Sequence, residues 1–283
     1  MKYSVEQFNA SKQKQITLLG MSGVGKTRIS NILLKSGDWF HYSADYRIGT
    51  RYLDEAILDN IKQQAMQVPF LHDLLLSDSI YIGNNITFDH LKPVSTFLGK
   101  VGNPELGGLS LKEFKRRQQL HHDAEIAALL DVPKFIEKAQ NVYGYNHFIN
   151  DVGGSLCELD DEHVFKTLEE STLVIYIKAT KEDEQALIKR AESSPKPLYY
   201  REDFFDEQLS LYLKENNSEY CAQIDPDDFV RWVFPKLLYS RIPRYEAIAE
   251  KYGYTITTDE LAQVKDSNDF HTLIQTAIAR KEN

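Results

Sequence analysis

The sequence predicts an α/β protein of three layers, in which helices cover both faces of a central parallel β-sheet. Segments typical of buried strands alternate with segments typical of helices, a pattern that indicates parallel strands joined by helical crossovers. The clearest strand, at 172–177, is apolar after Thr172 and lacks the alternation of a half-exposed strand. A glycine-rich segment separates the first predicted strand from the first predicted helix.

The elements follow in order along the chain. A short apolar run predicts a strand at 16–19, and further strands are predicted at 40–45, 147–151, 172–177 and 254–257. Helical spacing of apolar residues predicts helices at 26–34, 51–66, 111–130, after Pro133, 181–190 and 270–280. Between Phe70 and Gly108, glycine, asparagine and proline break every apolar run, so this stretch is predicted to be irregular.

These elements divide the chain into a core and two additions. The core is expected at 1–50, 146–190 and 237–283. A helical and irregular substrate-side insertion is expected at 51–145, and a long lid at 191–236. A chain of 283 residues suits one such enlarged domain.

Composition narrows the class of protein. Apolar residues make up 42% and charged residues 27%, which excludes wholesale disorder. Basic residues number 33 and acidic residues 42, so the net charge of −9 argues against nucleic acid as the main partner.

Cysteine use and hydropathy favour a soluble protein of the cytoplasm. Cys157 and Cys221 lie far apart and form no CxxC pair, so a disulfide framework is not expected. No apolar run approaches the ~20 residues that a membrane span needs. Residues 1–14 are polar and lack the apolar centre of a secretory signal. The sequence does not specify an oligomeric state.

Residues 20–27, GMSGVGKT, match the phosphate-binding pattern G-x-x-x-x-G-K-[ST] between a predicted strand and a predicted helix. Glycines let the backbone turn its N–H groups toward phosphate oxygens, and the positive end of the following helix adds to their attraction. Lys26 is expected to reach the β- and γ-phosphates, and Thr27 to offer its hydroxyl to Mg²⁺. The pattern therefore predicts ATP and Mg²⁺, with nucleotide contacts from Gly20, Ser22, Gly23, Val24, Gly25, Lys26, Thr27 and Arg28.

Two aspartates, Asp45 and Asp151, end predicted strands. The carboxyl ends of parallel strands face the ligand crevice, so either residue could hold Mg²⁺ or orient a substrate hydroxyl. A turn or helix-cap role is the alternative for each.

Basic residues surround the predicted lid loop at 193–197. A cation such as Arg190 or Lys196, carried on a closing loop, can stabilise a phosphoryl group in transfer. A solvated basic loop is the alternative. The stretch 201–231 holds nine acidic and three basic residues, and we expect it to form a solvated helical face.

Taken in order, these features resemble shikimate kinase and related small-molecule kinases of the nucleoside-monophosphate-kinase-like type. Asp45 stands where the family has the second carboxylate of a D-x-D pair, which binds and helps activate the acceptor hydroxyl. Glu-Phe-Lys-Arg at 113–116 is similar to the family's E-F-R segment, whose arginine holds the substrate carboxylate. Val152, Gly153 and Gly154 resemble the glycine triplet beside the substrate.

The resemblance continues toward the C-terminus. Lys196-Pro197-Leu198 is similar to the R-P-L of the family's lid. Residues 241–249, RIPRYEAIA, resemble R-x-P-x-Y-x-E-x-A, whose first arginine contacts the substrate carboxylate, and 257–259 stand where the adenine-side loop begins. Ser43 replaces the first aspartate of D-x-D, and lysine replaces arginine in the lid.

Residues and resemblance together predict an ATP-dependent kinase of a small, carboxylate-bearing metabolite. Lys26 and the loop amides would hold the phosphates, and Asp45 would orient or deprotonate the acceptor. The other expected site residues are Thr27 and Asp151 for Mg²⁺, Arg116, Gly153, Gly154 and Arg241 for the acceptor, and Lys196 or Arg190 over the transferred phosphate.

Two other functions remain open. A switch ATPase would hydrolyse ATP to move the lid and bind a protein partner. A kinase of nucleotides or nucleic-acid ends could use the basic residues at 112–117, although the acidic balance argues against it.

Overall fold

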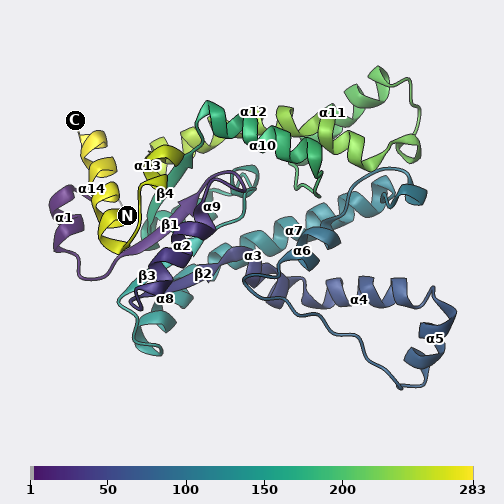
Figure 1. The fold of residues 1–283 in the computed structure, drawn as a ribbon, viewed down its shortest axis with the longest axis horizontal. Coiled ribbons are helices and arrows are strands. Elements are labelled where there is room, and N and C mark those ends of the chain that lie inside the picture. The colour runs from purple at the N-terminus through teal and green to yellow at the C-terminus, as the bar shows by residue number, and fades with distance from the viewer. Residues whose placement is uncertain (1–2, 283) are drawn as a thin grey trace.

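The computed structural model describes residues 3–282 and contains one sheet of five parallel strands in the order β2–β3–β1–β4–β5 (Figure 1). The strands are β1 (Gln15–Leu19), β2 (Trp39–Ser43), β3 (His147–Asp151), β4 (Leu173–Lys178) and β5 (Gly253–Thr257). In β1 and β4, consecutive side chains are buried. Since consecutive side chains point to opposite faces, helices cover both faces, and the predicted three-layer fold is confirmed.

Helices fill most of the remaining chain. They are α1 (Val5–Ala10), α2 (Lys26–Lys35), α3 (Ala44–Arg47), α4 (Asp54–Ala65), α5 (Pro69–Leu76), α6 (Lys92–Leu98), α7 (Leu111–Leu130), α8 (Val132–Asn141), α9 (Glu162–Ser171), α10 (Lys181–Ser193), α11 (Glu202–Glu215), α12 (Pro226–Tyr252), α13 (Thr258–Ala262) and α14 (Ser267–Glu282). A π-helix, η1 (Ile48–Tyr52), follows α3, and short 3₁₀ turns are η2 (Pro104–Leu106), η3 (Leu156–Glu158) and η4 (Cys221–Gln223). Among residues 3–282, no helix has both the length and the apolar character to cross a bilayer.

The register of the sheet brings three strand ends together. Asp151 of β3 lies opposite Leu18 of β1 on one side and Ser43 of β2 on the other. The segments that leave these strands therefore start at one edge of the sheet. They are the glycine-rich loop after β1, α3 after β2 and the glycine pair after β3.

The substrate-side insertion is more helical than expected. The prediction of an irregular stretch from Phe70 to Gly108 was wrong for α5 and α6. Pro69 and Pro93 lie in the first turns of these helices, where a missing N–H costs no helical hydrogen bond. A small apolar core that includes Phe97 of α6 and Ala128 of α7 joins the insertion to α7.

A second extension is built from α11 and α12 (Figure 1). Helix α12 has 27 residues and continues through Pro235 and Pro243, so the predicted segments 191–236 and 237–283 share one helix. Its first half packs with α11 and with Phe114 of α7 around a core that contains Phe229. The acidic stretch thus has a solvated face and an aromatic inner face.

Replacing Phe229 by alanine should destabilise this extension strongly. The ring is 1% exposed and contacts the rings of Phe205, Tyr212 and Trp232. Its loss should lower the free energy of unfolding by about 3–5 kcal/mol, measured by urea denaturation. Tyr239→Ala, on the same helix at a side chain 49% exposed, is the control. Equal losses in both variants would contradict the packing described.

Candidate active site

The glycine-rich loop links β1 to α2 and wraps around a lysine ammonium. Gly23 and Gly25 have φ values of +96° and +100°, left-handed conformations that favour glycine. Lys26 opens α2, and its Nζ donates to the carbonyl oxygens of Gly20 at 2.7 Å and Met21 at 3.0 Å. The ammonium is therefore held inside the loop, at the positive end of the helix.

Thr27 and Asp151, the two residues expected to hold Mg²⁺, are hydrogen-bonded to each other. The Thr27 hydroxyl donates to Asp151 Oδ2 at 2.8 Å, which joins the first turn of α2 to the end of β3. Mg²⁺ prefers a few protein oxygens and takes its other ligands from water and phosphate, so this all-oxygen pair fits it. His41 Nε2 lies 3.9 Å from Asp151 Oδ2. Burial lowers the pKa of His41, so its imidazole is neutral and does not compensate the negative charge of Asp151. That charge can therefore interact with a bound cation.

Replacing Asp151 by asparagine should therefore weaken the response to Mg²⁺. The amide keeps the size of the side chain and removes its charge, so we expect the Mg²⁺ concentration for half-maximal turnover to rise about 10- to 100-fold. A magnesium titration of ADP release measures this shift. Asp78→Asn, at an exposed turn, is the control. An unchanged titration curve would remove Asp151 from the metal site.

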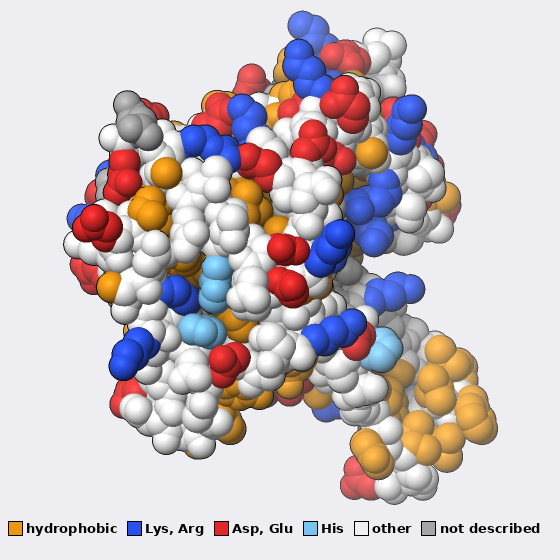
Figure 2. Space-filling model, turned by 60° about the vertical axis from the view of Figure 1, so that its left-hand side comes forward, with side chains coloured by type: hydrophobic (Ala, Val, Ile, Leu, Met, Phe, Trp, Pro, Cys, Tyr) orange, Lys and Arg blue, Asp and Glu red, His pale blue; other side chains and the backbone are white. Residues whose placement is uncertain are grey.

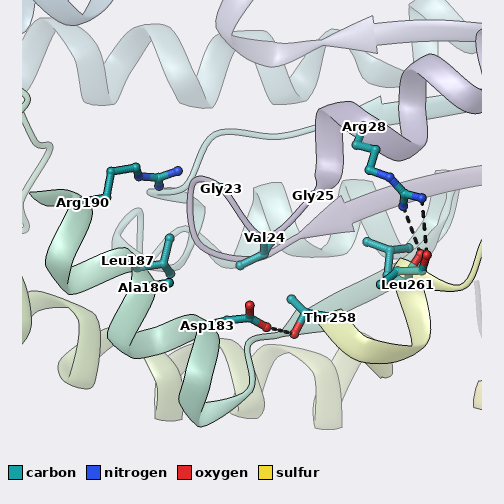
Figure 3. Close-up of a pocket in the computed structure, with 11 residues that line it drawn as sticks. Gly23, Val24, Gly25, Arg28, Asp183, Ala186, Leu187, Arg190, Thr258 and Leu261 are labelled. Carbon is teal, nitrogen blue, oxygen red and sulfur yellow. Dashed lines mark hydrogen bonds between the residues drawn. The ribbon is translucent and has the colours of Figure 1, made fainter.

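A cavity of about 470 Å³ opens beside the loop (Figure 3). Its walls come from the loop, α2, α10 and α13. They combine apolar side chains with a few polar groups, as small-molecule sites usually do. The lining residues are Gly23, Val24, Gly25, Arg28, Asp183, Ala186, Leu187, Arg190, Thr258, Leu261 and Ala262. The position next to the loop suits the base and sugar of a nucleotide.

Two arginines define this cavity. The Arg28 guanidinium donates to the carbonyls of Leu261 at 3.2 Å and Ala262 at 3.4 Å, which ties α2 to the end of α13 (Figure 3). It also donates to the carbonyl of Val264 at 3.0 Å. Arg190 Nη2 donates to the carbonyl of Ser22 at 3.0 Å, and its guanidinium covers Gly23. Arg190 therefore lies over the loop, whereas Lys196 is exposed in the segment between α10 and α11.

Asp45 lies beside Gly153, near Lys26 and Asp151. It sits in the first turn of α3 and not at the end of the strand as predicted, because the Ser43 side chain caps a new helix there. Burial, with the nearby charge of Asp151, raises the pKa of Asp45 to about 6, and the charge of Lys26 opposes this rise. The carboxyl group is therefore suited to accept a proton near neutral pH.

The glycine pair after β3 lies between these groups. A Cβ on Gly154 would come within 2.6 Å of the Ser22 backbone nitrogen, so only glycine lets the two loops approach this closely. A Cβ on Gly153 would lie 3.0 Å from Asp45 Oδ1 and 3.1 Å from Glu125 Oε1. Gly153 therefore separates Asp45 from a second carboxyl group.

Sequence reasoning missed Glu125. It projects from α7 and is 0% exposed, and burial raises its pKa to about 7 despite a hydrogen bond from Ser155. Its position in the sequence could have revealed it, because helical spacing places Glu125 and His121 on the same face of α7 as Phe114 and Ala128. An acid on the apolar face of a helix is expensive to bury, so it is a candidate for function.

Arg116 and Arg241 lie on different helices, α7 and α12, and each is paired with a glutamate. Arg116, 56% exposed, forms two hydrogen bonds with Glu113, and Glu125 lies nine residues further, about 13.5 Å along α7. Arg241 is buried on α12, where Nε donates to Glu158 Oε1 at 2.9 Å. Both arginines that were expected to clamp a substrate anion are thus engaged by glutamates, each of which also pairs with a second arginine.

Comparisons with known proteins give structural likenesses only. No family model matches the sequence, and no curated protein matches it. A shikimate kinase from Bacteroides thetaiotaomicron is 15% identical, with a TM-score of 0.41 over 95% of this chain and 96% of its own. A shikimate kinase from Acinetobacter baumannii in complex with shikimate is 13% identical, with a TM-score of 0.42 over 99% of both chains. One from Aquifex aeolicus is 12% identical, with a TM-score of 0.28 over 81% of this chain and 98% of its own.

Proposed function

We propose that this protein is an ATP-dependent kinase that phosphorylates a hydroxyl group of a small metabolite. The observation that carries the proposal is the hydrogen bond between Thr27 and Asp151 beside the phosphate-binding loop, with Asp45 facing Gly153 next to it. Phosphoryl transfer needs groups that hold the phosphates, a bound metal and an oriented acceptor. In this proposal the phosphate-binding loop, the pair Thr27 and Asp151, and Asp45 meet these three needs in turn.

In the proposed reaction, the acceptor oxygen attacks the γ-phosphorus of ATP. A bond forms between that oxygen and phosphorus, the bond to the β,γ-bridging oxygen breaks, and ADP leaves. Asp45 takes the hydroxyl proton, while Lys26 and the loop amides hold the phosphates. Thr27 and Asp151 would hold Mg²⁺, which supplies charge neutralisation on the phosphates when bound.

The remaining expected residues take supporting roles in this proposal. Arg190 and Lys196 are the cations available to the transferred phosphate from the lid side. Arg28 closes the cavity on the nucleotide side by its bonds to the loop after α13. Arg241 contributes by holding the carbonyl of Gly154 at 2.8 Å, and so fixes the glycine pair.

The experiment is ADP release from Mg-ATP by the purified chain, with and without pooled small metabolites that include shikimate. Acceptor-dependent release is the expected result, and dividing the active pool then identifies the acceptor. Release that no pool accelerates would contradict the proposal.

A switch ATPase is the second candidate, favoured by one surface. The tip of the insertion exposes the apolar side chains of Val68, Phe70, Leu76 and Tyr81 (Figure 2). Gathered apolar side chains of this kind mark interaction surfaces. Slow ATP hydrolysis that is stimulated by a macromolecule would favour this function over the kinase.

A further inference from the structure

Three oxygen atoms from separate segments converge at Gly153. The position of a Cβ there would lie 3.0 Å from Asp45 Oδ1, 3.1 Å from Glu125 Oε1 and 3.5 Å from Ser155 Oγ. Glu125 Oε2 accepts a hydrogen bond from Ser155 at 2.7 Å, whereas Glu125 Oε1 is buried without a hydrogen-bond partner among residues 3–282. A buried acceptor oxygen without a donor is costly, which points to a donor supplied by a ligand.

The cations near these carboxyl groups already have partners. All three nitrogens of Arg241 donate to protein acceptors, namely Glu158 Oε1 at 2.9 Å and the carbonyls of Gly154 at 2.8 Å and Tyr199 at 2.6 Å. Lys26 donates to its own loop. The acceptor side of the site therefore presents two carboxyl groups, and the Arg241 guanidinium is paired with Glu158, which also contacts Arg201 at 3.4 Å.

The other titratable neighbour does not supply a charge. His121 Nδ1 lies 3.7 Å from Glu125 Oε2, on the same helix. Burial lowers the pKa of His121 to about 4, so its imidazole is neutral near pH 7. The ring is stacked on Tyr199, which keeps it beside Glu125 and away from solvent.

We propose that the acceptor is a small amino alcohol, whose ammonium group binds Glu125 while a hydroxyl on a neighbouring carbon faces Asp45. An ammonium group donates three hydrogen bonds and accepts none, which matches a site of oxygen acceptors. A carboxylate in the same place would face two carboxyl groups, so the site disfavours hydroxy acids. The inference rests on the proposed kinase function and names its acceptor class.

The unmodified protein gives the first test. ADP release from Mg-ATP is measured with three matched pools, made of amino alcohols (amino sugars included), neutral polyols and hydroxy acids. Amino alcohols should accelerate release at least about tenfold more than either other pool, the ratio expected from one charged hydrogen bond. Preference for hydroxy acids or polyols would overturn the acceptor class and leave the kinase function standing. Release that no pool accelerates would overturn both.

Two variants then test the role of Glu125, measured on the best amino alcohol. Glu125→Gln should raise KM for the amino alcohol about 10- to 100-fold and leave KM for ATP unchanged. It should also reduce the preference for the amine over the corresponding polyol, a change that a purely structural residue would not cause. Glu137→Gln, at an exposed position of α8, is the control. An unchanged KM and preference in a folded Glu125→Gln protein would contradict the assignment.

Discussion

Lys26→Ala should abolish nucleotide turnover and leave the fold intact. The ammonium is the positive charge held inside the loop, where it would meet the β- and γ-phosphates. Preorganised charge of this kind is typically worth about 100- to 1,000-fold in rate, so we expect kcat to fall by at least that factor. The measurement is ADP release at saturating Mg-ATP, with or without acceptor.

The fold should survive because, among residues 3–282, the Lys26 ammonium donates to two carbonyls of its own loop and to no other element. Burial lowers the pKa of the Lys26 ammonium, and the charges of Asp151, Asp45 and Glu125 oppose this effect without cancelling it. A lowered pKa means that folding disfavours the charged form, so the folded chain does not depend on this charge for stability. Far-UV circular dichroism checks this point. Lys35→Ala, in the exposed last turn of the same helix, controls for loss of a lysine. Undiminished turnover in Lys26→Ala would remove the loop from the proposed mechanism.

The sheet could be predicted because its signals are local. Strands β1 and β4 are short, mainly apolar runs, and burial on both faces leaves no polar alternation, so the run itself marks the strand. The predicted strand at 147–151 coincides with β3, and the predicted helix at 111–130 coincides with α7. The loop at 20–27 could be predicted for the same reason, because its glycines and lysine act within eight consecutive residues.

The helical extensions could not be predicted because their cause is tertiary. Pro235 and Pro243 should interrupt a helix, yet α12 continues through both while its apolar side packs against α11, the sheet and η3. In such segments packing with distant residues outweighs local propensity.

In the candidate site too, residues with a local sequence signal could be predicted, and residues that depend on tertiary contacts could not. Lys26, Thr27 and Asp151 could be placed from a motif and from the strand order that a parallel sheet implies. Glu125 could not be placed, because only the fold brings α7 across Gly153 to face Asp45. Arg241 was expected at the acceptor, but its partner Glu158 is 83 residues away in sequence, and no local pattern reports that ion pair.

Asp45→Asn should abolish phosphorylation of the acceptor and preserve ATP binding. Asparagine keeps the shape of the side chain and the start of α3, but it cannot accept the hydroxyl proton. General-base catalysis contributes about 10²- to 10⁴-fold, so kcat with acceptor should fall within that range. The KM for ATP should stay unchanged, because Asp45 lies on the acceptor side of the loop. Steady-state kinetics with ATP and acceptor varied in turn separates the two effects.

The pH profile gives Asp45 a second, independent readout. A general base acts only when deprotonated, and burial with the charge of Asp151 raises its pKa to about 6. Free-enzyme kcat/KM should therefore fall as pH decreases through about 6, whereas an ordinary aspartate would lose its charge only near pH 3.8. The residual activity of Asp45→Asn should lack this acidic limb, and Asp59→Asn, at an exposed position of α4, should keep it. An acidic limb that persists unchanged in Asp45→Asn would assign the base to another group, and Glu125 would then be the first to replace.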